Sequence, residues 1–75
     1  MILKEVAKNS REVFRVSITE YRGRRFVDLR AYYQDAEGNL KPTRKGISLS
    51  GEILGDAIEG LSEAANILKA EKTAE

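Results

Sequence analysis

The chain has 75 residues, of which 13 are Lys or Arg and 12 are Asp or Glu, and it contains no histidine, cysteine or tryptophan. Disulfides, thiolate metal sites, thiol nucleophiles and histidine bases are thereby excluded. We expect one domain over residues 1–75, with no enzymatic activity, cofactor or metal. Because a chain this short buries only about 60% of its unfolded surface, we also expect it to gain stability by oligomerisation.

We expect no signal peptide at the N-terminus. Charged residues follow residues 1–3 directly, and no apolar run approaches the roughly 20 residues that a membrane span needs. We therefore expect a cytoplasmic protein. Residues 1–11 show no clear period, and they either lead into the first strand or pair at a sheet edge.

Strand patterns occupy residues 12–49. The first strand alternates an apolar face with a polar one: Phe14, Val16 and Ile18 against Arg15, Ser17 and Thr19. Residues 21–24 form the expected hairpin tip, where Gly23 supplies a positive φ. The second strand resumes the alternation from Arg25: Val27, Leu29 and Ala31 on one face, Phe26, Asp28, Arg30 and Tyr32 on the other.

Turn residues and a proline divide the rest of this region. Residues 35–39, Asp-Ala-Glu-Gly-Asn, predict a turn; a calcium loop would need a bidentate glutamate where Gly46 stands. A third strand is predicted near residues 40–44, and its Pro42 favours an edge position or a bulge. Gly46 then precedes a short fourth strand at residues 47–49.

At Ser50 the period changes to that of a helix, predicted over about residues 51–70 with Ser50 as N-cap. Acidic residues form one stripe, and an apolar arc of roughly 180° lies opposite, wider than one packing partner requires. We expect a bulky ridge of this arc to pack on the sheet: Leu54, Ile58, Leu61, Ala65 and Leu68. A strip of mostly small residues beside it is the expected dimer interface: Ile53, Ala57, Gly60 and Ala64.

The predicted fold is therefore α+β. A four-stranded antiparallel sheet, with strands over about residues 12–49, precedes one C-terminal helix, and two copies pair through their helices as a homodimer. The alternative is a loosely packed monomer that merely tolerates the helix glycines.

Charge is unevenly distributed along the chain. Residues 15–46 carry eight basic and four acidic groups, whereas residues 47–75 carry six acidic and two basic groups. Aromatic residues are interleaved with the basic ones, which is typical of surfaces that bind single-stranded nucleic acid: bases stack on rings for roughly 1 to 3 kcal/mol each while cations neutralise phosphates. The alternative to nucleic-acid binding is a solvent-exposed hairpin with ordinary surface arginines.

The segment from Val16 to Leu49 resembles the C-terminal single-stranded-DNA-binding domain of the transcriptional coactivator positive cofactor 4, a family with bacterial and phage relatives. The matching stretches are residues 21–24, 28–33, 35–38 and above all 41–49, Lys-Pro-Thr-Arg-Lys-Gly-Ile-Ser-Leu. The acidic amphipathic helix that follows is also in the family's order. Thr43 departs from the glycine usual at its position.

The resemblance implies a set of nucleic-acid-binding residues. Tyr21 stands where the family has a stacking aromatic residue, and Tyr33 stands where some members have a stacking tryptophan. The strand alternation, however, puts Tyr33 on the face of Leu29 unless the strand is bulged. The remaining implied contacts are basic: Arg22, Arg24, Arg30, Lys41, Arg44 and Lys45.

Together these features predict a homodimer that binds single-stranded DNA with little sequence specificity. The expected setting is transcription, replication or repair, in a bacterial nucleoid or a phage-infected cell. Two alternatives stay open: RNA binding or RNA chaperoning on the same surface, and a protein-interaction module that uses the acidic helix.

Overall fold

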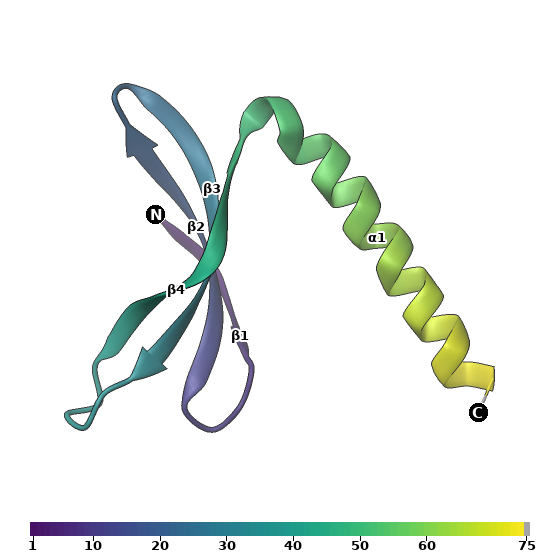
Figure 1. Cartoon of the computed structure of the whole chain (residues 1–75), viewed down its shortest axis with the longest axis horizontal. Coiled ribbons are helices and arrows are strands. Elements are labelled where there is room, and N and C mark those ends of the chain that lie inside the picture. The colour runs from purple at the N-terminus through teal and green to yellow at the C-terminus, as the bar shows by residue number, and fades with distance from the viewer. Residues whose placement is uncertain (75) are drawn as a thin grey trace.

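The computed structural model describes residues 1–74, with the side chains of residues 1–72. Its elements in chain order are β1 (Ile2–Ala7), β2 (Glu12–Tyr21), β3 (Arg24–Gln34), β4 (Leu40–Ser50) and α1 (Gly51–Ala74). The strands form one antiparallel sheet in the order β1-β2-β3-β4, and α1 follows it (Figure 1). The predicted four-stranded antiparallel sheet with one C-terminal helix is confirmed.

Two details of the predicted sheet are wrong. Residues 40–50 form one strand, where we predicted a break before residues 47–49. The fourth strand is instead β1, which pairs with β2 at the sheet edge, one of the two roles left open for residues 1–11. Gly46 does not turn the chain, because it pairs with Arg30 within the β3–β4 ladder.

The hairpin turns are fixed by short side chains. In the β1–β2 turn, Oδ1 of Asn9 accepts hydrogen bonds from the backbone N–H groups of Arg11 and Glu12, at 2.9 and 2.8 Å. In the β3–β4 turn, Oδ1 of Asp35 accepts from the N–H groups of residues 37 and 39, both at 2.9 Å. Such bonds are the reason Asn and Asp favour turns. The turn predicted at residues 35–39 is confirmed, and no cluster of potential metal ligands occurs in the part of the chain described.

Helix α1 leaves the sheet instead of covering it. It begins at Gly51, the residue after the last residue of β4, and runs away from the strands (Figure 1). The expectation that the bulky ridge packs on this chain's own sheet is therefore wrong: Leu61 and Leu68 are 62% and 65% exposed.

Apolar burial in a single chain is shallow. Among the described residues, Ala31 is the one buried hydrophobic residue, and no large side chain is fully buried. Exposed apolar side chains lie on both the sheet and the helix, including Ile47, Ile53 and Ile58. Within the described residues there is also no helix of the length and apolarity that crossing a bilayer demands.

Candidate nucleic-acid interface

The β2–β3 register divides the central sheet into two faces. Arg15 lies opposite Arg30, Ser17 opposite Asp28, and Tyr21 opposite Arg24. Because directly opposite residues point to the same side, these side chains share one face, as the alternation predicted. This polar face includes Arg15, Ser17, Thr19 and Tyr21 of β2 with Arg24, Phe26, Asp28, Arg30 and Tyr32 of β3.

The β2–β3 hairpin tip exposes an aromatic ring among cations. Tyr21 is 64% exposed, and the Cζ atom of Arg22 lies 5.2 Å from its ring centroid. Arg22 and Gly23 have φ values of 53° and 78°, the positive pair that a type I′ turn requires. Arg24 approaches Glu52 of α1 at 3.8 Å between Nη2 and Oε1, but both side chains are exposed, so this ion pair contributes little.

In the middle of the polar face, two arginines are neutralised in place. The Arg15 guanidinium contacts Oε2 of Glu5 at 2.7 Å through both Nε and Nη2. Arg30 donates from Nε and Nη2 to the two oxygens of Asp28, at 3.1 and 3.0 Å. Hydrogen bonds to Glu5 and to Asp28 raise the pKa of Arg15 and of Arg30, respectively. Two like charges directly opposite each other would repel, and these carboxylates offset that repulsion.

The same region contains an aromatic contact that the sequence reasoning missed. The Cζ atom of Arg15 lies 4.2 Å from the ring centroid of Tyr32, within the range of a cation–π contact. Tyr32 pairs with Val13 on β2, and its place in the β3 alternation puts it on the polar face. The strand alternation in the sequence already places Tyr32 on this face, but it does not reveal the contact with Arg15.

Arg30 keeps part of its hydrogen-bonding capacity. A guanidinium has five N–H donors, and Arg30 uses one each on Asp28 Oδ2, Asp28 Oδ1 and the backbone oxygen of Thr43. Asp28 is only 8% exposed, and its Oδ1 also accepts from the hydroxyl of Ser48 at 3.1 Å. Arg30 thus sits in a polar network that links β3 to β4.

The basic residues of β4 lie on and beside a bulge. Arg30 pairs with Gly46 and Tyr32 with Pro42, so three residues of β4 stand opposite Ala31 alone. These are residues 43–45, and Arg44 and Lys45 are both exposed. Pro42, which predicted an edge position or a bulge, borders this one on the edge strand.

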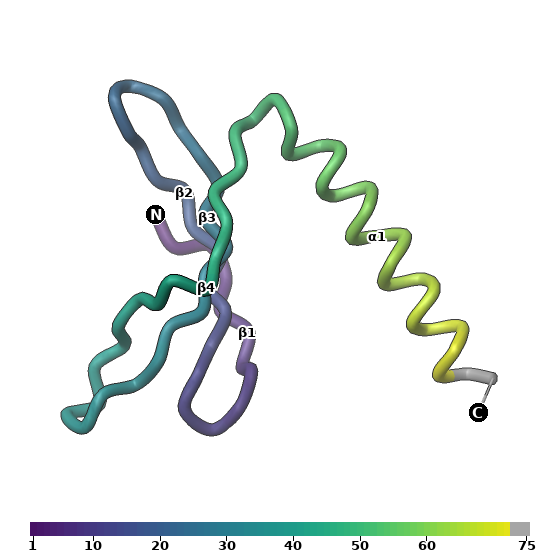
Figure 2. Tube along the Cα trace, viewed as in Figure 1, coloured from purple at the N-terminus to yellow at the C-terminus, as the bar shows by residue number. Residues whose placement is uncertain are grey.

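Lys41 and Tyr33 lie together on the other face of the sheet. They pair with each other, and Tyr33 also pairs with Glu12 in an unbroken β2–β3 register. The register therefore leaves Tyr33 on the face of Leu29, away from Tyr21. Lys41 approaches Oδ2 of Asp35 at 3.9 Å. The structure thus groups Tyr21, Arg22 and Arg24 at the β2–β3 turn and Lys41, Arg44 and Lys45 toward the β3–β4 turn. These two turns lie at opposite ends of the sheet (Figure 2).

Glu12 lies near this second basic group. A hydrogen bond from Asn9 Nδ2 at 2.9 Å is the main cause that lowers the pKa of the Glu12 carboxyl, followed by the charge of Lys8 at 3.8 Å and, more weakly, that of Lys45.

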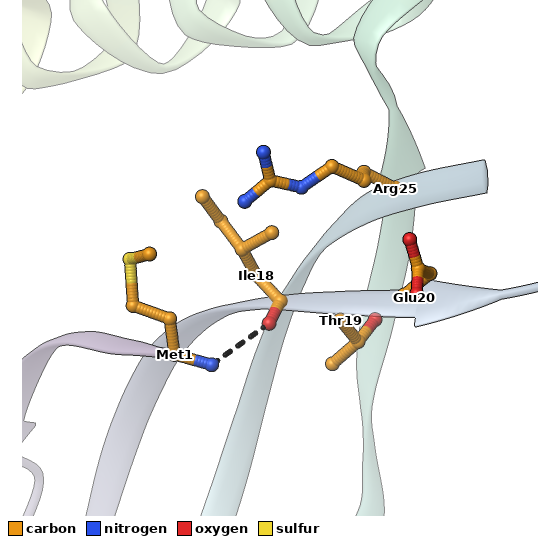
Figure 3. Close-up of a pocket in the computed structure, with 5 residues that line it drawn as sticks. All are labelled: Met1, Ile18, Thr19, Glu20 and Arg25. Carbon is orange, nitrogen blue, oxygen red and sulfur yellow. Dashed lines mark hydrogen bonds between the residues drawn. The ribbon is translucent and has the colours of Figure 1, made fainter. Parts of the chain in front are cut away.

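The described residues form open hollows on the protein surface. One, of about 340 Å³, lies between the N-terminus and the β2–β3 hairpin and is lined by Met1, Ile18, Thr19, Glu20 and Arg25. In Figure 3, Arg25 extends over Ile18 toward Met1, whose α-ammonium donates to the Ile18 oxygen at 3.1 Å. This bond and that from the Ile18 N–H to the Met1 oxygen, at 2.9 Å, attach the N-terminus to β2.

Known proteins resemble this chain over most of its length. The family described as Transcriptional Coactivator p15 (PC4) matches residues 8–55. A PC4 homologue from Burkholderia pseudomallei is 40% identical with a TM-score of 0.82; the match covers 87% of this chain and 88% of that one in an orthorhombic crystal form, or 96% in a tetragonal form.

A more distant match shares the fold. It is the bacteriophage T5 homologue of the eukaryotic transcription coactivator PC4, a protein implicated in recombination-dependent DNA replication. It is 21% identical, with a TM-score of 0.60, and the match covers 96% of this chain and 91% of that one. The family match over residues 8–55 and the Burkholderia homologue, together with the sheet and helix described above, establish that the chain belongs to the PC4 family.

Proposed function

We propose that this protein binds single-stranded DNA with little sequence preference, through the polar face, the basic β2–β3 tip and the basic residues Arg44 and Lys45 of the β4 bulge. The observation that carries the proposal is the hairpin tip, where the exposed ring of Tyr21 lies beside the guanidinium of Arg22. Such a ring offers a stacking surface to an unpaired base, and the arginine offers a charge to the adjoining phosphate. Stacking of this kind contributes roughly 1 to 3 kcal/mol per base.

The spacing of the two basic groups supports a strand that runs along β3. At about 3.3 Å per residue, Arg24 at the tip and Ala31 opposite the bulge are about 23 Å apart. A single strand stacked at about 3.4 Å per nucleotide covers this length with about seven nucleotides, and a more extended strand needs fewer. Each protomer would then hold about seven nucleotides or fewer between its basic ends.

Duplex DNA is a poorer fit. A helix that reads the major groove needs basic and polar side chains directed at the DNA. In α1, the one helix of the described residues, an acidic stripe carries Glu52, Asp56, Glu59 and Glu63. Bases inside a duplex also present no free face to the ring of Tyr21. Melted or mismatched DNA, whose bases are already unpaired, would be preferred.

We also propose that the active form is a homodimer paired through α1. The helix ridge and the apolar sheet residues are exposed in a single chain, which lacks a large buried side chain within its described part. At Gly60 an added Cβ would meet no atom within 4 Å, so nothing in the chain itself requires glycine there. A second backbone approaching Ile53, Ala57, Gly60 and Ala64 would account for the small residues and would cover the ridge.

The biological setting follows from the family by analogy. The family description names a transcriptional coactivator, and the phage T5 homologue is implicated in DNA replication. We propose that this chain acts in the cytoplasm on opened DNA, during transcription, replication or repair in a bacterium or a phage-infected cell. No reaction is proposed.

Competition binding tests the proposal. Labelled oligo-dT is displaced by unlabelled oligo-dT, by RNA and by duplex DNA of equal length. We expect oligo-dT to compete best; equal competition by RNA would favour the RNA-binding alternative, and no binding to any nucleic acid would refute the proposal. If about six phosphates are neutralised per dimer, log K should fall with log salt at a slope of about −4. A flat salt dependence would contradict the phosphate contacts.

A further inference from the structure

Side-chain hydrogen bonds tie the β4 bulge to β3, although its basic side chains are exposed. Residues 43–45 stand opposite Ala31, two more than a regular ladder would place there. A bulge leaves its extra residues unpaired with the neighbouring strand. Side-chain hydrogen bonds of Thr43 and Arg30 connect this segment to β3.

Thr43 fixes the bulge from within. Its hydroxyl donates to the backbone oxygen of Ala31 at 2.8 Å and accepts from the backbone N–H of Lys45 at 3.1 Å. The first bond ties the bulge to β3, and the second sets the position of the Lys45 backbone relative to Thr43. Thr43 is half-buried, whereas Arg44 and Lys45, which follow it directly, are exposed.

Arg30 fixes the bulge from β3. Its Nη1 donates to the backbone oxygen of Thr43 at 2.9 Å, while Asp28 holds the rest of the guanidinium in a two-bond fork. Gly46 leaves the space for this arrangement: an added Cβ would lie 2.8 Å from Cζ of Arg30 and 2.8 Å from the Leu29 oxygen. The glycine of the Lys-Pro-Thr-Arg-Lys-Gly stretch is thus explained by the arginine that lies across it.

We propose that Thr43 and Arg30 are positioning residues for nucleic-acid binding, which hold the bulge in one conformation before the ligand arrives and so present Arg44 and Lys45. The inference rests on the proposed function. Ordering a loop or a long side chain on binding costs affinity, and a segment that is already ordered avoids the backbone part of that cost. In this role the hydroxyl of Thr43 touches no phosphate, and Arg30 acts through Thr43 instead of by its charge alone.

The central test compares Thr43→Val with Thr43→Ser. Valine keeps the β-branched shape without the hydroxyl, and serine keeps the hydroxyl. Affinity for labelled oligo-dT is measured between about 50 and about 200 mM salt. We expect Thr43→Val to bind about fivefold more weakly at every salt concentration, a typical effect of losing one or two hydrogen bonds, and Thr43→Ser to stay within about twofold of the wild type.

The slope of the salt dependence separates positioning from charge. Thr43→Val should keep the wild-type slope, because Arg44 and Lys45 can still contact phosphates in this variant. Lys45→Ala is the matched control and should give a slope shallower by about 0.7 for each bulge that contacts DNA. Arg30→Lys keeps the charge but loses the fork and the bond to Thr43; we expect it to weaken binding without changing the slope. Wild-type affinity in Thr43→Val or in Arg30→Lys would overturn the inference.

Amide hydrogen exchange of Lys45 provides a readout that is independent of DNA. Exchange in the free protein should be slower in the wild type and in Thr43→Ser than in Thr43→Val, since the Lys45 N–H donates to the Thr43 hydroxyl. Equal rates in all three proteins would overturn the inference even if Thr43→Val bound poorly. Failure of the proposed function has a different signature: the wild type itself would not bind oligo-dT.

Discussion

Arg22→Asn is expected to change stability and DNA binding in opposite directions. Arg22 holds a φ of 53° in a turn whose next residue is Gly23. A left-handed conformation costs a residue with a side chain roughly 1 to 2 kcal/mol, and asparagine tolerates it best among non-glycine residues. Asn-Gly is also the preferred pair in a type I′ turn. Arginine is therefore a poor choice for this turn, which suggests that it is present for another reason.

The magnitudes follow from the same geometry. If asparagine recovers about 0.5 kcal/mol, the melting temperature should rise by about 2 to 4 °C for a domain of this size. Binding should weaken because the tip loses a cation and the contact at 5.2 Å with the Tyr21 ring. One phosphate contact fewer makes the salt slope shallower by about 0.7, equivalent to about fivefold in affinity at about 0.1 M salt.

Thermal unfolding and anisotropy titrations with labelled oligo-dT measure the two effects on the same preparations. Arg22→Lys is the control, since it keeps both the charge and the unfavourable φ; its stability and its salt slope should stay close to those of the wild type. A loss of stability in Arg22→Asn would show that the turn does not favour asparagine. Wild-type binding by that variant would refute the role assigned to the tip.

Three further changes test other parts of the molecule. Tyr21→Ala should weaken oligo-dT binding by roughly 1 to 3 kcal/mol with little change in thermal unfolding. Tyr33→Ala changes a ring on the other face and should weaken binding less. If titrations show a larger loss of affinity for Tyr33→Ala, the binding face was assigned wrongly. Gly60→Leu should shift the sedimentation profile from dimer to monomer, and an unchanged profile would exclude this strip as the interface. The pKa of Glu12 lies below its ordinary value of 4.5, so its stabilising effect should be present above that pH and vanish as pH falls through the lower folded-state pKa. Melting temperatures of wild type and Glu12→Gln should therefore converge in acid, and a constant difference down to acid pH would contradict this.

Local patterns predicted much of the fold. The alternation in β2 and β3 gave the correct faces because a pleated strand places neighbours on opposite sides whatever surrounds it. The turn at residues 35–39 was predictable because Asp35 bonds to nearby backbone groups. The start of α1 was marked by a change of period. Each of these features depends on residues close together in the chain.

The errors all involve contacts between distant residues. Gly46 was interpreted as a break between two strands, whereas it is glycine because Arg30 of β3 lies over it. Pairing of β1 with β2 depends on a register that residues 1–11 do not reveal by themselves. The Arg15–Tyr32 contact and the Thr43 hydrogen bonds likewise become visible only once three strands are aligned. The direction in which α1 leaves the sheet depends on the backbone at the β4–α1 junction, which the pattern of apolar residues does not encode.

Sequence specificity depends on which charged and hydrogen-bonding side chains already have partners within the protein. At the centre of the polar face, Arg15 and Arg30 are neutralised by Glu5 and Asp28, and no buried side-chain polar atom of the described residues lacks a partner. Reading a base edge requires a donor or acceptor aimed at it, and groups already bonded to one another are poorly placed to do so. Charge available to phosphates lies instead toward the two ends, at Arg22 on the tip and at Arg44 and Lys45 on the bulge. On such a surface the basic ends would bind the phosphates of a strand, and the bases would stack on aromatic rings without hydrogen bonds that distinguish them. We therefore expect affinity for single strands with little preference for sequence.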